Sequence, residues 1–441
     1  MSDLLQIGAS GARAFNTALA TIGENVSNMS TPGYARRTIT TAAGAGGVVV
    51  QSINRSWDDY KAAAKRDAAS DAASASTYYD WMGKVESAMS DDAAGIGRSA
   101  TGIFTSGDAL AANPGDTSGR KAFLAAIQTT TNAFNATASS LKSASDDVGV
   151  TATSSVEAVN ATLDNLDNVN SALHAARAGT AGQANLLDQR DKLLDSLSSS
   201  IGIDVTLASD GSANVKLAGG GATLAESGGP GARLSLALGT GTNAGRISIT
   251  AIGTTNETPV ADVGGSLGGL VKSADTIATR RVAMDTLATQ FATQINSWSA
   301  KGLDANGAAG GTLVSGTTAA SLALATTDPA KVPAASPAAG TAPAATNGNL
   351  LALSSLRGDG GIEKSWGTLV TDHARAVDAA KTSSTAAASR ADATAASLAD
   401  LSSVDLDTEA ADLIRFQQAY AGAAKVIQAA RETMQAILDV I

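Results

Sequence analysis

The pattern of apolar positions is most regular at the two ends of the chain. In residues 413–441, apolar side chains recur in alternating steps of three and four, with polar side chains between them. This stripe consists of Leu413, Phe416, Tyr420, Ala423, Ile427, Ala430, Met434, Ile437 and Ile441. Residues 5–26 carry a matching stripe of Leu5, Gly8, Ala12, Phe15, Leu19, Ile22 and Val26. Such steps are typical of helices that pair as a coiled coil, so the terminal helices are expected to pack on each other.

A single amphipathic helix of this length is marginal in water and needs a partner. The simplest partner is the core of its own domain. The alternative is a helix pair that leaves apolar surface for other subunits, since each buried Leu, Ile or Phe contributes roughly 1.5–3 kcal/mol. On this alternative, residues 1–37 and 405–441 are expected to become ordered only when copies of the chain assemble.

Between the ends, helical and strand periodicities alternate. Helices are expected over residues 58–89, 119–142, 150–178, 267–299 and 362–401, and residues 106–113 lead to a turn at 113–116. A period of two indicates antiparallel strands over residues 203–207, 214–217, 234–238 and 246–250. Residues 28–53 are expected to be an extended, Gly-rich connection that includes a β-type run at Val48-Val49-Val50. Residues 302–349, rich in Ala, Gly, Pro and Thr, are expected to be an exposed loop or a loose β excursion.

These elements predict a mainly α protein with a small antiparallel β domain and with layered domains built from discontinuous pieces. The innermost domain is a terminal coiled coil, residues 1–37 plus 405–441. The next is a long-helix bundle, residues 38–200 plus 264–404, with a loop excursion at 302–350. The outer β domain, residues 201–263, is expected to be peripheral and to project furthest, because glycine clusters bound its strands.

The first helix is expected to stop within the sequence Asn-Met-Ser-Thr-Pro-Gly-Tyr at residues 28–34. Asn28 and Thr31 compete for backbone hydrogen bonds, and Pro32 followed by Gly33 is typical of the centre of a type II turn. This segment, together with Gly-Ala-Ser-Gly at 8–11 and residues 404–427, resembles the terminal signatures of bacterial flagellar axial proteins of the rod, the hook and the hook–filament junction.

A motif in the middle of the chain indicates which of these flagellar families the chain resembles. Residues 185–197, Asn-Leu-Leu-Asp-Gln-Arg-Asp-Lys-Leu-Leu-Asp-Ser-Leu, are similar to a helix of the hook-associated protein 1 family of junction proteins. Segments at 110–120 and 264–270 extend the resemblance over most of the chain. One departure is Arg36-Arg37, where the family usually has Arg-Gln. Within residues 185–197, Asp188 and Lys192 are expected to form an exposed pair worth only tenths of a kcal/mol.

The resemblance implies a structural protein that assembles as a homo-oligomeric ring between hook and filament. Its implied partners are the hook protein, a second junction protein or the filament, and a flagellar export chaperone. It also implies an extracellular position in the flagellum, reached from the cytoplasm without a cleaved signal peptide. The alternative is a hook or distal rod protein; Tyr34 directly after Pro-Gly and the helix at 185–197 favour the junction family.

The expected assembly interface lies in the two stripes and in the turn after the first helix. It comprises Leu5, Phe15, Leu19, Ile22, Val26, Asn28, Thr31, Pro32, Gly33, Tyr34, Leu413, Phe416, Gln417, Tyr420, Ile427, Met434, Ile437 and Ile441.

Composition limits the other classes of function. The 441 residues include no Cys, so disulfides and zinc-thiolate sites are excluded, and the net charge of −10 argues against nucleic acid as a partner. No run of about 18 apolar residues occurs that would span a membrane, and Asp3 stands where a signal peptide would carry positive charge.

Candidate chemistry is sparse, and we expect no enzyme, cofactor or metal site. His174 and His373 lack a neighbouring ligand and are expected to be solvated or packed side chains. Asp304 begins a calcium-like loop that lacks the later ligands, and the glycines at 239–245 join two expected strands and open no helix. A wall-cleaving enzyme on an axial scaffold would require a carboxyl group with a raised pKa in a cleft, which the sequence does not mark.

Overall fold

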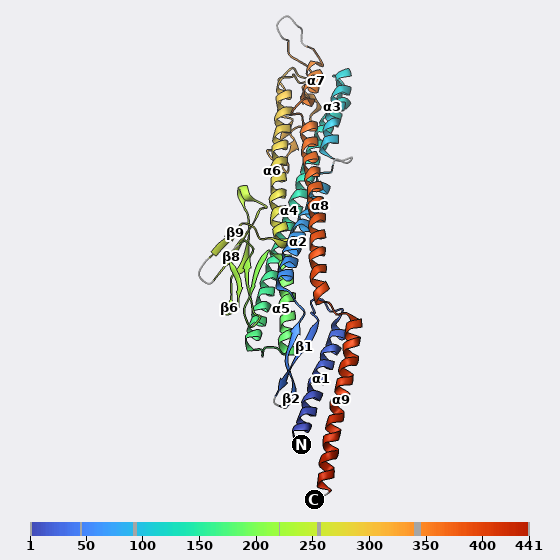
Figure 1. The fold of residues 1–441 in the computed structure, drawn as a ribbon. Coiled ribbons are helices and arrows are strands. Elements are labelled where there is room, and N and C mark those ends of the chain that lie inside the picture. The colour runs from blue at the N-terminus through green and yellow to red at the C-terminus, as the bar shows by residue number, and fades with distance from the viewer. Residues whose placement is uncertain are drawn as a thin grey trace.

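A computed structural model describes residues 2–44, 46–90, 95–219, 221–253, 257–338 and 345–439. The molecule is elongated, with both termini at one end (Figure 1). The helices are α1 (Ser2–Asn28), α2 (Asp59–Ala88), α3 (Ile96–Ala112), α4 (Thr117–Ala175), α5 (Ala181–Ser200), α6 (Gly265–Ala300), α7 (Gly348–Ala352), α8 (Ile362–Ser402) and α9 (Leu406–Leu438). The strands are β1 (Arg37–Gly44), β2 (Gly47–Arg55), β3 (Ile203–Leu207), β4 (Ala213–Leu217), β5 (Thr223–Glu226), β6 (Gly229–Pro230), β7 (Arg233–Leu238), β8 (Ile247–Ile252), β9 (Glu257–Val260), β10 (Val314–Ser315) and β11 (Ala323–Leu324).

The predicted fold class is confirmed: the chain is mainly helical with small antiparallel sheets. At the end that carries the termini, α1 and α9 lie side by side and the β1–β2 hairpin lies beside α1 (Figure 1). The long helices form a bundle above them. Its core includes two aromatic pairs, Phe123–Trp298 and Phe134–Phe291, each with ring centroids 5.6 Å apart. These pairs join α4 to α6, and they are buried because both helices direct an apolar stripe inwards.

Much of the connection expected over residues 28–53 is extended, as β-strands: β1 and β2 pair antiparallel, with Arg37 opposite Arg55 and Ile39 opposite Ile53. The pairing of the two strands as a hairpin was not predicted. The hairpin tip is held to α1 because Ser10 Oγ donates to the Gly46 carbonyl at 2.9 Å and accepts from the Val48 amide at 3.2 Å. The β-branched run in β2 supplies the strand propensity, and the first helix supplies the surface on which the hairpin packs.

The two helices expected over residues 119–142 and 150–178 are one continuous helix of 59 residues, α4. Gly149 favours a break in a helix, yet a Cβ there would lie 3.3 Å from Leu238 Cδ2, so the glycine allows β7 to approach the helix. Val148 and Ala152 on either side are fully buried. Tertiary packing therefore overrides the weak local helix propensity.

The described part of the 302–349 segment is packed rather than an exposed loop. Leu313, Leu322 and Val332 are each at most 2% exposed. The β10–β11 pair is short, and bundle side chains bind the backbone around it: Asn135 Nδ2 donates to the Ala319 carbonyl at 2.7 Å, and Asn296 Nδ2 to the Val314 carbonyl at 2.7 Å. Of the two alternatives predicted from the sequence, the β excursion is the closer description. Pro343, one of the prolines of this segment, lies outside the described residues.

The expected antiparallel strands form two sheets, with orders β3-β4-β5-β6 and β7-β8-β9. The sheets project from the flank of the bundle rather than from the end opposite the termini (Figure 1). Both are bonded to α4. Asn170 exchanges two hydrogen bonds with the Ala213 backbone, at 2.9 and 2.8 Å, and Asn160 exchanges two with Leu234, both at 2.9 Å.

Candidate assembly interface

The terminal helices run antiparallel and are in contact along most of α1. Phe15 packs against Phe416 with ring centroids 6.3 Å apart. Nearer the start of α1, a Cβ on Gly8 would lie 2.7 Å from Ile427 Cγ1 and 3.3 Å from the Ala423 carbonyl oxygen, so the glycine brings the two backbones close together. The stripes recognised in the sequence therefore meet, which confirms the predicted pairing of the terminal helices.

Helix α9 begins at a local capping signal. The Asp405 side chain accepts a hydrogen bond from the Thr408 hydroxyl at 2.7 Å and one from the Asp407 amide at 3.1 Å. These hydrogen bonds hold the pKa of the Asp405 carboxyl below its ordinary value. A short break separates α8 from α9 here, as the Ser402-Ser403 sequence predicts, and the cap fixes where the terminal helix starts.

The residues expected at the interface fall into two groups. Leu5, Phe15, Leu19, Ile22, Leu413, Phe416 and Ile427 are partly or fully covered within the chain. Val26, Tyr420, Met434 and Ile437 are 41%, 40%, 38% and 45% exposed, and Gln417 is exposed as well. Ile441 lies outside the described residues. The second group leaves apolar surface on the helix pair after the two stripes have met.

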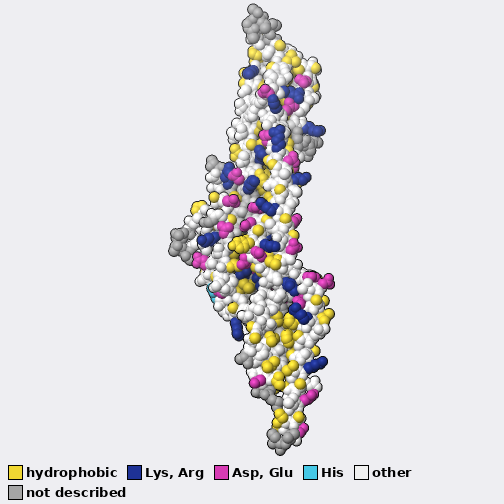
Figure 2. Space-filling view, viewed as in Figure 1, with side chains coloured by type: hydrophobic (Ala, Val, Ile, Leu, Met, Phe, Trp, Pro, Cys, Tyr) yellow, Lys and Arg dark blue, Asp and Glu magenta, His cyan; other side chains and the backbone are white. Residues whose placement is uncertain are grey.

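Further apolar side chains on these helices were missed by the sequence reasoning. Leu4, Ile7, Ile414 and Val426 lie off the main stripes and are exposed. Hydrophobic side chains gather on the face of the terminal helices shown in Figure 2. Searching each helix for a second apolar stripe, rather than for one heptad seam, would have found them. Exposed apolar surface of this kind marks interaction sites in soluble proteins.

The predicted turn after α1 has the expected geometry. The Tyr34 amide donates to the Thr31 carbonyl at 3.1 Å, and Gly33 has φ of +82°, which suits glycine at the third position of a type II turn. Thr31 Oγ1 donates to Asn28 Oδ1 at 3.2 Å. Thr31, Pro32 and Gly33 are exposed, whereas Asn28 is partly buried. The turn therefore presents its tip to solvent.

Tyr34 is directed inwards from this turn. Its hydroxyl donates to Asn25 Oδ1 at 2.8 Å, and burial raises its pKa to about 12. The side chain therefore stays protonated and keeps its donor. Asn25 Nδ2 in turn donates to Glu409 Oε2 at 3.0 Å, which links α1 to the start of α9.

Glu409 is a functional residue that sequence reasoning missed. Its side chain is 1% exposed, and Arg36 Nε donates to Glu409 Oε1 at 2.7 Å.

The expected exposed pair of Asp188 with Lys192 is wrong, because Asp188 pairs with Arg37 at 2.6 Å and with Arg55 at 2.7 Å. Burial raises the pKa of the Asp188 carboxyl, an effect that the two arginines oppose.

The two histidines differ in their surroundings. His373 is 1% exposed, with Nε2 at 3.0 Å from the Met82 carbonyl, and burial lowers its pKa, with Arg280 acting in the same direction and Glu86 opposing. His174 is exposed and contacts the Ser227 carbonyl and Asp210, which raise its pKa. Neither lies in a ligand cluster: the described residues hold no group of three or more acidic or His side chains that could bind a metal ion.

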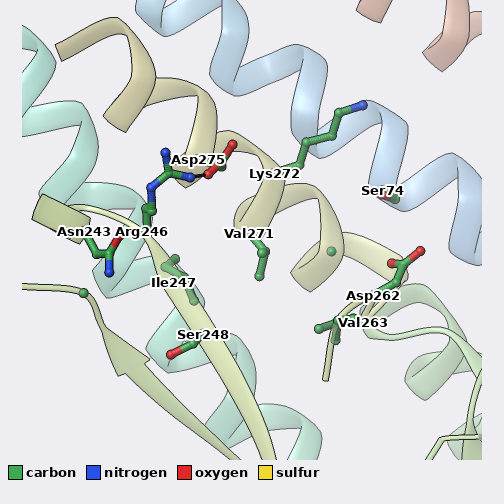
Figure 3. A pocket seen from close by; sticks show the side chains of 13 residues that line it. Ser74, Asn243, Arg246, Ile247, Ser248, Asp262, Val263, Val271, Lys272 and Asp275 are labelled. Atoms are coloured by element: carbon green, nitrogen blue, oxygen red, sulfur yellow. Dashed lines mark ion pairs between the residues drawn. The ribbon is translucent and has the colours of Figure 1, made fainter. Parts of the chain in front are cut away.

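A pocket with a volume of about 780 Å³ lies between β8 and α6 (Figure 3). Its charged side chains are already engaged. Arg246 forms an ion pair with Asp275, Lys272 Nζ lies 4.1 Å from the centre of the Tyr78 ring, and Asp262 accepts from the Gly264 amide at 3.1 Å. Both carboxylates that line the pocket, Asp262 and Asp275, therefore have a partner within the chain.

Across the described ranges, every helix is too polar or too short to cross a bilayer.

The comparisons with known proteins fit this geometry. A family model described as the flagellar hook-associated protein FlgK helical domain matches residues 82–314, more than half of the chain. The chain belongs to this family. Two further family models match the ends of the chain. The model described as the flagellar basal body rod FlgEFG protein C-terminal matches residues 400–440, and the model described as the flagella basal body rod protein matches residues 5–34. Both terminal matches cover the paired helices.

Individual relatives of this FlgK-family chain match it at low sequence identity. Flagellar hook-associated protein 1 of Salmonella typhimurium is 26% identical over 322 residues, which cover 70% of this chain and 58% of that protein. The Escherichia coli protein of the same name is 25% identical over 328 residues, covering 70% and 59%. The chain thus spans about three fifths of these relatives. The structure of the flagellar hook junction protein FlgK from Burkholderia pseudomallei matches with a TM-score of 0.67 at 16% identity, over 76% of this chain and 98% of that one, which shows a shared fold.

Proposed function

We propose that this chain is a structural component of the bacterial flagellum that assembles as a ring between hook and filament. Family membership and the names of the relatives support a junction protein. We propose a packing role rather than catalysis, with the hook protein and a second junction protein or the filament as its neighbours. An export chaperone is proposed as its partner in the cytoplasm, before export to the cell exterior.

The observation that carries this proposal is the apolar surface left on the paired terminal helices. Beyond Ala430, which is 4% exposed, Met434, Ile437 and Leu438 on α9 are 38%, 45% and 63% exposed. Covering these three large apolar side chains would contribute several kcal/mol, at roughly 1.5–3 kcal/mol for each one fully buried. Neighbouring copies in a ring would cover this surface, because each copy presents the same helix.

The test uses one charge placed on either face of the end of α9. Ile437→Asp places a carboxylate in the exposed apolar surface, and Gln435→Asp places the same charge on the polar face two residues away. Both positions are exposed, so neither change disturbs the core of the single chain. Each variant, labelled through one introduced cysteine, is expressed in cells that lack their own copy, and its position on isolated hook–basal bodies is imaged.

We expect wild type and Gln435→Asp at the hook–filament junction and Ile437→Asp absent from it. Incorporation of Ile437→Asp at the wild-type level would refute the packing argument. Wild-type label along the hook or in the rod would instead support the alternative of a hook or distal rod protein.

A further inference from the structure

The terminal helix pair joins the long bundle through a group of buried and half-buried charges. We call this group the joint cluster. Its bases are Arg36, Arg37, Arg55, Lys65, Arg66 and Arg190, and its acids are Glu24, Asp188, Asp191, Asp195, Glu409 and Asp412. Arg415 on α9 also pairs with Asp412, at 3.0 Å. The joint cluster lies where the chain crosses twice between bundle and terminal pair, at residues 29–36 and 403–405.

Arg36 connects the end of α8, the segment that leads to α2, and the start of α9. Its amide donates to the Ser402 carbonyl at the end of α8 at 2.8 Å, and its carbonyl accepts from the Ser56 amide, just before α2, at 2.8 Å. Its side chain reaches α9, where Nε lies 2.7 Å from Glu409 Oε1 and Nη2 lies 3.6 Å from Asp412 Oδ2. One residue therefore ties the end of α8 and the approach to α2 to the first turn of the terminal helix.

Arg37 connects α1 to α5. Its guanidinium donates to Glu24 on α1 at 3.1 Å and to Asp188 and Asn185 on α5 at 2.6 and 2.7 Å. Asn25 on α1 also binds both backbone groups of Arg37, at 2.9 and 3.0 Å. The Arg37 side chain is 2% exposed, so these bonds lie away from water and are sensitive to geometry.

Arg55 holds the other side of the hairpin to the same helix. It is the register partner of Arg37, and it contacts Asp188 at 2.7 Å and Asp191 at 2.8 Å. Asp191 is 1% exposed and also accepts from Arg66 on α2 at 3.0 Å and from Arg190 at 2.7 Å. The carboxylates at 188, 191 and 195 share one face of α5, so α5 receives both strands of the hairpin and α2 together.

Ala35 within the first crossing is fully buried, but the large apolar side chains beside the two crossings are not. Val26, Met29 and Leu406, large apolar side chains at the two crossings, are 41%, 45% and 46% exposed. Planar guanidinium groups bound to two carboxylates tolerate little rotation, unlike an apolar contact. Removing one partner of such a buried pair leaves an uncompensated charge, so the cluster favours a single arrangement.

We propose that the joint cluster fixes the angle between the terminal helix pair and the bundle within the single chain, so that breaking it leaves both parts folded but free to swing. This inference does not depend on the proposed function, since it concerns the isolated chain.

The experiment measures this angle through a distance. The chain has no cysteine, so Ala388→Cys on α8 and Gln418→Cys on α9, both at exposed positions, accept spin labels selectively. If α8 and α9 continue roughly in line, a rise of 1.5 Å per residue places the labels about 45 Å apart, which suits double electron–electron resonance. We expect a narrow distance distribution for the labelled wild type.

Three backgrounds test the cluster. Arg37→Gln is expected to widen the distance distribution and to extend it towards shorter distances, because bending at the joint brings the two labels together. Arg375→Gln, which removes an ion pair on α8 whose arginine is 75% exposed, is expected to leave the distribution unchanged. The double variant Arg37→Gln with Asp188→Asn removes both charges, so its melting temperature is expected to recover towards wild type while the distribution stays wide.

The double variant separates orientation from stability. A narrow distribution in the double variant would overturn the proposal, because the helix pair would then keep its angle without the bridge. A wide distribution in the wild type, or equal widening in Arg375→Gln, would overturn it as well. If Arg37→Gln alone fails to fold, Glu409→Gln, which removes the α9 charge that Arg36 and Asn25 bind, takes its place with the same expected widening.

Discussion

Replacing Gly8 by alanine tests how closely the terminal helices pack. In an open helix interior, this change is favourable by roughly 0.5–1 kcal/mol, because glycine loses more backbone freedom on folding. At Gly8, however, the new Cβ would lie 2.7 Å from Ile427 Cγ1, 3.2 Å from the Ile427 amide nitrogen and 3.3 Å from the Ala423 carbonyl oxygen. The Ile427 side chain can rotate, but the two backbone atoms move only if the helices separate.

A matched change on the same helix isolates this packing cost. A Cβ on Gly23 would have no neighbour within 4 Å, so Gly23→Ala gains only the backbone term. Because that gain is common to both variants, their difference is the cost of overpacking, about 1–3 kcal/mol. Gly422→Ala on α9, also without a neighbour within 4 Å, gives a second control.

The assay is amide hydrogen exchange of the full chain, read over residues 416–430. A difference of about 1–3 kcal/mol corresponds to about 5- to 150-fold faster local opening in Gly8→Ala than in Gly23→Ala. Slower exchange in Gly8→Ala, equal to that in the two controls, would refute the close approach of α1 and α9 at this position.

Four further changes have defined outcomes. Gly33→Val is expected to strain the positive-φ turn by about 1–3 kcal/mol, to lower monomer stability by that amount and to reduce incorporation into hook–basal bodies. Gly33→Asn is the control, because asparagine tolerates this φ. Asn170→Ala is expected to destabilise the fold by about 2–4 kcal/mol in denaturant titrations, because it leaves a buried amide and carbonyl of β4 unpaired, whereas Ala at exposed Asn168 is expected to change stability by less than about 0.5 kcal/mol. The pKa of His373 is lowered in the folded chain, so its stabilising contribution is present above the unfolded pKa of about 6.5 and is lost as the pH falls towards the folded pKa. In thermal melts at about pH 7.5 and 5.5, His373→Gln is therefore expected to show a smaller fall in melting temperature on acidification than wild type. His174 has a raised pKa and stabilises the fold at the lower pH, so His174→Asn is expected to show a larger fall; the opposite ranking would contradict both assignments.

The features that the sequence predicted correctly depend on local patterns. The steps of three and four at the two ends identify the faces of α1 and α9 that meet at Phe15 and Phe416. The Pro32-Gly33 pair predicts the turn, because few residues other than glycine adopt the positive φ that Gly33 shows. Alternation of apolar and polar residues likewise predicts β3, β4, β7 and β8.

The features that were missed depend on residues distant in sequence. Arg37 and Asp188 are 151 positions apart, and within the helix at 185–197 the aspartate has a nearer candidate partner in Lys192. One signal was present: acids at 188, 191 and 195 share a face of one helix, and three like charges on one face need bases from another element. The unbroken α4 could not be predicted either, because Gly149 lowers local propensity and only the approach of β7 explains it.

The sequence predicts that both terminal regions become ordered only on assembly. For α9, the structure limits this expectation to the last turns of the helix. At its start, α9 is anchored in the single chain through Glu409, whose carboxylate is bound by Asn25 and Arg36. Beyond Ala430, every described residue of α9 is exposed, so its last turns are stabilised by hydrogen bonds within the helix itself, such as that from Thr433 Oγ1 to the Ala429 carbonyl. We therefore expect a gradient of hydrogen exchange in the dilute chain, slow over residues 406–416 and fast over residues 431–438, with the fast segment becoming protected on assembly. Slow exchange over 431–438 at low concentration would show that the end of the helix needs no neighbour, and fast exchange over 406–416 would contradict the anchoring role of Glu409.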